Sequence, residues 1–65
     1  PRGTISQFDS ENGCGFIERE DGSPVFFYES EVVAPGITLK EGDSVVFGIA
    51  MEYQGPIAVS IRLEI

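Results

Sequence analysis

The chain has 65 residues and a net charge of −7, with 42% hydrophobic and 23% charged residues. A chain of this length forms one domain that buries roughly 60% of its unfolded surface, so we expect a single domain over residues 1–65 with a thin core. The composition excludes a disordered tail, no apolar run approaches the ~18 residues of a membrane-spanning helix, and the acidic charge disfavours a nucleic-acid partner unless a local surface binds it.

The first predicted elements are three strands, at residues 3–8, 14–19 and 25–28. The Asn12-Gly13 pair tolerates positive φ and predicts a tight turn between the first two strands. Residues 21–24 read Asp-Gly-Ser-Pro, which turns the chain into the β-branched and aromatic third strand. We therefore predict an antiparallel meander.

Residues 29–43 lose the alternation, and we predict a long crossover there, with one helical turn at residues 30–33 and a break at Pro35-Gly36. Two further strands follow, joined by a turn at residues 52–55. Hydrophobic residues alternate along both strands, which predicts one buried face on each. The alternating residues are Val45, Phe47, Ile49 and Met51 on the first of these strands and Ile57, Val59, Ile61 and Leu63 on the second.

This order of elements includes no amphipathic helix that would cover a sheet. Closing the sheet on itself buries its apolar face and removes its exposed edges. The predicted fold class is therefore all-β, a single five-stranded antiparallel β-barrel.

The order of segments resembles the cold-shock domain family from end to end. The segments that carry the resemblance are N-G-C-G-F-I-E from residue 12, V-F-F-Y-E-S from residue 25, T-L-K-E-G-D-S-V-V-F-G-I from residue 38 and Q-G-P-I-A-V from residue 54. The resemblance implies an oligonucleotide-binding (OB) barrel that binds single-stranded RNA or DNA on an aromatic and basic face.

The binding motifs of that family are depleted in this chain. Where the family usually has K-G-F-G-F-I, this chain has Asn12 in place of the lysine and Cys14 in place of the first aromatic. Where the family's V-F-V-H-F ends in an aromatic residue, this chain has Glu29. Where the family usually has K-V-K-W-F, this chain has Thr4-Ile5-Ser6-Gln7-Phe8, which contains neither lysine nor the tryptophan. We therefore expect weaker binding than in typical members.

Strand alternation predicts which aromatic side chains remain for binding. If Ile17, Val25 and Phe27 face inward, then Phe16, Phe26 and Tyr28 face outward and form one patch. The predicted nucleic-acid site is this patch, with Phe8 and Gln7 at its margin and Arg19, then Arg2, as phosphate contacts. Four acidic residues are expected nearby: Asp9, Glu11, Glu29 and Glu31.

Catalytic and metal-binding patterns are absent from the sequence. The chain has no histidine, and Cys14 has no cationic neighbour in sequence that would activate its thiol. Glu18 and Glu20 are read as solvated charges, and neither a glycine-rich phosphate loop nor metal-ligand spacing occurs. We expect no enzyme activity, cofactor or metal. The single cysteine excludes an internal disulfide and favours the cytoplasm.

Three functions remain open. The first is a module that binds single-stranded RNA or DNA with low specificity, in the manner of an RNA chaperone. The second is a diverged fold used for protein contacts or homodimerisation through the same aromatics with Val46 and Ile57, because exposed apolar side chains commonly mark a partner surface. The third is a spacer domain within a longer protein.

Overall fold

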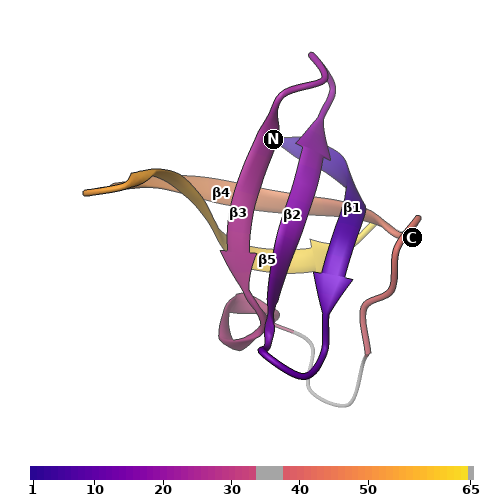
Figure 1. Ribbon diagram of the computed structural model, residues 1–65. Helices are drawn as coiled ribbons and strands as arrows, with labels where there is room; N and C mark the ends of the chain where they lie inside the picture. Colours follow the sequence, from indigo (N-terminus) through magenta and orange to yellow (C-terminus); the bar gives the residue numbers. More distant parts are fainter. Residues whose placement is uncertain (34–37, 65) are drawn as a thin grey trace.

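The computed structural model describes residues 1–33 and 38–64. Its elements in chain order are β1 (Arg2–Asp9), β2 (Cys14–Arg19), β3 (Pro24–Tyr28), the short 3₁₀ helix η1 (Glu29–Glu31), β4 (Ser44–Glu52) and β5 (Gly55–Leu63). The strands close into a barrel in the order β1-β2-β3-β5-β4 (Figure 1). The closed five-stranded barrel is thus confirmed. The helical turn begins one residue earlier than predicted, and Pro35-Gly36 lies outside the described residues.

One strand pairing departs from the antiparallel prediction. β3 and β5 run parallel, with Phe26 opposite Ile57 and Phe27 opposite Ala58, whereas the other neighbours in the barrel are antiparallel. The reason is geometric: strand directions cannot alternate all the way round a closed ring with an odd number of strands. Closure therefore requires one parallel seam, and it falls where the crossover leaves the meander.

The barrel interior is filled by aliphatic and aromatic side chains from every strand. Ile17, Val25 and Phe27 are buried, which confirms their predicted inward orientation. The remaining buried hydrophobic residues are Ile5, Leu39, Val45, Phe47, Ala58 and Ile61. Burial of this apolar surface is the main favourable term in the folding of the barrel.

The prediction of one continuous buried face on β4 is wrong. Val45 and Phe47 are buried, but Ile49 and Met51 are 37% and 74% exposed. The pairing of β4 with β5 shifts register between Val46 and Gly48, and the β4–β5 hairpin then projects from the barrel (Figure 1). At this shift Val46 lies opposite Arg62 and Gly48 opposite Val59, so the extra residue lies on β5. A bulge increases the local twist of the paired strands, which directs the hairpin away from the core.

β5 also breaks its predicted alternation. Ala58 and Ile61 are buried, while Ile57, Val59 and Leu63 are only partly buried. Ser60 has φ 52°, in the left-handed region. This local change lets two residues three apart face the core. Residues 1–33 and 38–64 form no helical segment with the length and hydrophobicity that a transmembrane span requires.

Candidate nucleic-acid interface

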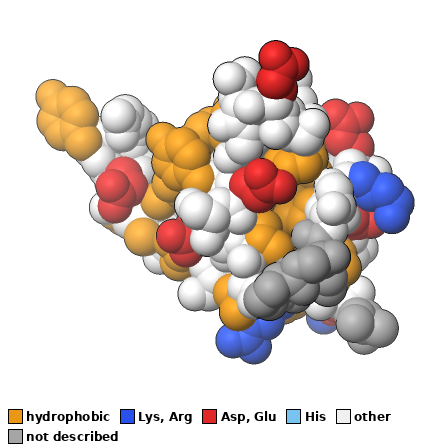
Figure 2. All heavy atoms as spheres, turned by 90° about the horizontal axis from the view of Figure 1, so that it is seen from below, with side chains coloured by type: hydrophobic (Ala, Val, Ile, Leu, Met, Phe, Trp, Pro, Cys, Tyr) orange, Lys and Arg blue, Asp and Glu red, His pale blue; other side chains and the backbone are white. Residues whose placement is uncertain are grey.

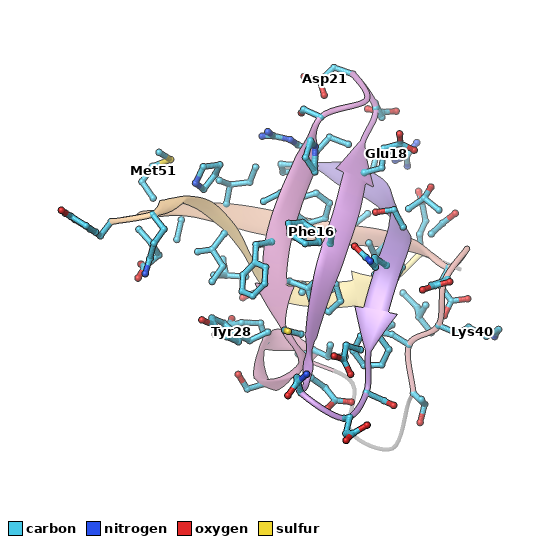
Figure 3. All side chains as sticks on the ribbon, in the orientation of Figure 1. Phe16, Glu18, Asp21, Tyr28, Lys40 and Met51 are labelled. Atoms are coloured by element: carbon cyan, nitrogen blue, oxygen red, sulfur yellow. The ribbon has the colours of Figure 1, made fainter. Side chains whose placement is uncertain are left out.

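Three aromatic side chains form a continuous row on the outer surface of β2 and β3, and we call Phe16, Phe26 and Tyr28 the aromatic strip. Phe16 lies opposite Phe26 across the two strands, with ring centroids 5.5 Å apart and planes at 72°. Phe26 meets Tyr28 edge-to-face at 5.0 Å and 89°. Phe16 and Tyr28 are 37% and 51% exposed (Figure 3), so the strip offers ring surface to solvent.

A hollow of about 510 Å³ lies on the β1 side of the strip, and we call it the β1 hollow. Its residues are Gln7, Phe8, Asp9, Ser10, Glu11, Cys14, Gly15, Phe16, Phe26 and Glu41. Phe8 is half-buried because its ring stacks on the core residue Phe27, with centroids 6.0 Å apart and planes at 12°. The structure therefore brings Phe8 and Gln7 together with the strip.

Gly15 permits the close approach of β1 at this hollow. A Cβ at this position would meet the carbonyl oxygen of Gln7 and would lie 3.0 Å from the ring of Phe27. A side chain there would push β1 and the Phe8 ring away from the barrel. The glycine of the second strand is thus needed for the shape of the β1 hollow.

A second hollow of about 350 Å³, the hairpin hollow, lies on the other side of the strip. Its apolar wall is made by Phe26, Tyr28, Pro56 and Ile57, and Glu52, Gln54 and Gly55 complete it. Phe26 borders both hollows, so the strip runs between them. The hollow was not predicted from the sequence. It forms because β3 and β5 pair in parallel and so bring Ile57 beside Phe26, and this pairing was not predicted either.

Arg19, a predicted phosphate contact, is not brought to the strip. It is half-buried at the end of β2 opposite Gly3, and it lines neither hollow. Its Nε is buried without a hydrogen-bond partner in the described part of the chain.

Arg2 and Arg62 lie elsewhere on the barrel. They flank Val46 across three neighbouring strands and line a separate hollow of about 630 Å³, the arginine hollow, which shares no residue with the other two. Arg2 is also paired with Glu64. Neither arginine borders the aromatic strip.

Lys40 is a candidate cation that the sequence did not single out. It lines a groove with Phe8, Ser10 and Glu41, and these three residues also line the β1 hollow. Its Nζ lies 3.6 Å from Asp43, and its side chain is 80% exposed (Figure 3). Lys40 belongs to the crossover, where no strand alternation exists that would have indicated its direction.

Carboxylates border both hollows. Asp9 and Glu11 line the β1 hollow as expected, and Glu41 and Glu52 are additions that the sequence did not indicate. Glu29 and Glu31, expected nearby, line neither hollow, and Glu31 accepts a hydrogen bond from the Ser60 N–H. Figure 2 shows acidic side chains among hydrophobic ones on one face of the molecule, with basic side chains toward its margin.

Asp9 is held in a turn that keeps it ionised. The side-chain amide of Asn12 donates to Oδ2 at 2.6 Å, and the backbone N–H groups of Glu11 and Asn12 donate to Oδ1. These hydrogen bonds, the Asn12 amide first, hold the pKa of Asp9 below its usual 3.8. Residues 1–33 and 38–64 contain no group of three His, Cys, Asp or Glu that could hold a metal ion.

Comparisons with known proteins agree with this architecture. Residues 1–64 match the family described as the 'Cold-shock' DNA-binding domain. The chain is 41% identical over 64 residues to "Probable cold shock protein A" of Mycolicibacterium smegmatis, covering 95% of this chain and 96% of that protein. It is 41% identical over 61 residues to the "Major cold shock protein" of Streptococcus pyogenes serotype M6, covering 92% and 91%.

A solved structure also resembles the barrel. The structure titled "drosophila Unr CSD456" superposes with a TM-score of 0.80 at 25% identity, covering 98% of this chain and 26% of that longer chain. The fold, the family match and the identity to bacterial relatives agree, and the chain belongs to the cold-shock DNA-binding domain family.

Proposed function

We propose that residues 1–65 act as one domain that binds single-stranded RNA or DNA with low overall specificity. The observation that carries this proposal is the aromatic strip, whose outward rings are continuous and flanked by a hollow on each side. Stacking of an unpaired base on an aromatic ring is worth about 1–3 kcal/mol and tolerates any base. The strip thus supplies the sequence-tolerant part of a nucleic-acid interface.

The proposed roles follow from where each side chain lies. Phe16, Phe26 and Tyr28 stack bases, and Phe8 and Gln7 contact the base that enters the β1 hollow. Lys40 replaces Arg19 as the phosphate contact, because it lies in a groove beside that hollow. By mass action, a domain that binds only unpaired strands shifts nucleic acid away from paired structures, which is the activity of an RNA chaperone.

Binding is expected to be weaker than in typical members of the family. Each phosphate contact needs a cation, and Arg2 and Arg62 lie at a hollow that shares no residue with the hollows beside the strip. Carboxylates instead border both of those hollows. Stacking therefore has to supply most of the affinity.

A fluorescence-polarisation titration with a short pyrimidine oligonucleotide at low salt tests the proposal. We expect saturable binding, and Phe16→Ala should weaken it about tenfold because one stacking surface is lost. Ile49→Ala is the matched control, since Ile49 has the same 37% exposed fraction on β4 but lines neither hollow beside the strip. Absence of binding up to about 100 μM would refute the proposal.

Self-association is a second candidate function. The surface that supports it is not the predicted one, which combined the aromatic side chains with Val46 and Ile57. Val46 lies between two arginines and Ile57 lies in the hairpin hollow, so these two residues share no patch. The projecting β4–β5 hairpin instead exposes Ile49, Met51 and Tyr53. Met51 is labelled on this hairpin in Figure 3. Sedimentation at several concentrations tests this candidate: a constant monomer mass counts against a homodimer.

A further inference from the structure

We propose that the β1 hollow favours a base that carries an exocyclic amino group, and that Glu41 sets this preference. The inference rests on the proposed function, because it concerns which base the same interface accepts. It goes beyond sequence-tolerant stacking by assigning a hydrogen-bonding role to one carboxylate.

Aromatic walls and a fixed carboxylate meet in this hollow. Phe8, Phe16 and Phe26 supply ring surfaces, and Glu41 lines the same space from the crossover. The backbone N–H of Phe8 donates to Oε2 of Glu41 at 3.3 Å. This contact ties the carboxylate to the strand that carries the Phe8 ring, and no hydrogen bond within the described residues engages its Oε1.

The neighbouring carboxylates are less suited to this role. Both oxygens of Asp9 already accept hydrogen bonds from its own turn, from Glu11 and Asn12. Glu11 lines the hollow, but no hydrogen bond in the described part of the chain anchors its carboxylate. Glu41 is therefore the carboxylate that is both anchored and able to accept a further donor.

An ionised carboxylate accepts hydrogen bonds and cannot donate them. Unpaired bases are read on their edges, and the amino group of cytosine is a donor that Glu and Asp commonly accept. Uracil presents a carbonyl oxygen at the same ring position, and its N3–H lies between two carbonyl oxygens. A carboxylate at the rim therefore attracts the cytosine edge and repels the uracil edge, while stacking on the rings is similar for the two pyrimidines.

Oligo-dC and oligo-dU of equal length form the test, because their bases differ only along this edge. We expect the wild-type chain to bind oligo-dC about five- to tenfold more tightly at low salt. Glu41→Gln keeps a carbonyl oxygen for the Phe8 N–H but adds a donor, so the preference should fall to nearly one. Glu20→Gln removes the same charge at the arginine hollow and should keep the preference.

Each outcome decides a separate point. Equal binding of the two oligonucleotides by the wild-type chain, or an unchanged preference in Glu41→Gln, overturns the role of Glu41 while leaving the proposed function intact. Loss of preference in both Glu41→Gln and Glu20→Gln also overturns it, because the effect would then come from net charge. If neither oligonucleotide binds the wild-type chain, the proposed function itself fails.

Discussion

Phe16 and Phe47 carry the same side chain on opposite sides of the barrel wall. Phe16 is 37% exposed in the aromatic strip, whereas Phe47 is 5% exposed in the core. Phe47→Ala should lower the free energy of unfolding by about 3–5 kcal/mol, enough to unfold much of a small domain. Phe16→Ala should cost far less. Urea unfolding of both variants checks this, and equal destabilisation would show that the two faces are wrongly assigned.

The carboxyl group of Asp9 makes part of the fold's stability depend on pH. Its pKa is lowered in the folded chain, first by the Asn12 amide, so folding favours the ionised form. The stabilisation is present above the unfolded value of 3.8 and is lost as pH falls through the lower folded value. Asp9→Asn should therefore be less stable than the wild-type chain at neutral pH, with a difference that shrinks below about pH 4. Unfolding midpoints measured across pH check this, and a difference independent of pH would contradict it.

At the residue scale, strand alternation was sufficient to predict the strip but not its charged surroundings. Ile17 and Phe27 are buried and Phe16 is exposed because β2 and β3 pair in regular register. Lys40 and Glu41 could not be placed, since they lie in the crossover, which has no periodicity. Arg19 was predicted as a phosphate contact from its charge alone, and its place at the end of β2 lines neither hollow beside the strip.

At the element scale, the strands were predictable and their irregularities were not. Hydrophobic alternation located β4 and β5, but the register shift after Val46 and the left-handed Ser60 change which residues face inward. Gly48 borders the register shift and is of a residue type that often marks a bulge, whereas Ser60 gives no such signal. The parallel seam between β3 and β5 follows from closure with an odd number of strands, a property of the ring and not of any one segment.

Ser60 offers a direct test of the irregularity in β5. Its φ of 52° is costly for a residue with a Cβ, and its side chain is exposed, so packing contributes little there. Ser60→Gly should leave the free energy of unfolding within about 1 kcal/mol of the wild type, whereas the β-branched Ser60→Val should lower it by about 1–3 kcal/mol. Thermal unfolding of the two variants checks this. Equal stability of the glycine and valine variants would mean that β5 does not need the left-handed conformation.

At the scale of the whole molecule, aromatic surface and positive charge are largely separated. Arg2 and Arg62 lie at the arginine hollow, while the strip and its hollows are bordered by carboxylates and by a groove that contains Lys40. A single-stranded ligand on the strip therefore meets few cations. Counterion release scales with the number of phosphates that cations neutralise, so salt should affect binding only weakly.

Two charge-removing variants separate the contribution of Lys40 from that of net charge. The slope of log K against log salt should be about −0.7 for the wild-type chain, which corresponds to one neutralised phosphate on a single strand. Lys40→Gln should bring this slope close to zero and weaken oligo-dC and oligo-dU by the same factor, because a phosphate contact carries no base information. Arg62→Gln removes an equal charge from a hollow that shares no residue with those beside the strip, so it should leave the slope unchanged. A slope lost in Arg62→Gln and kept in Lys40→Gln would mean that the backbone of the ligand runs over the arginine hollow instead of past the β1 hollow.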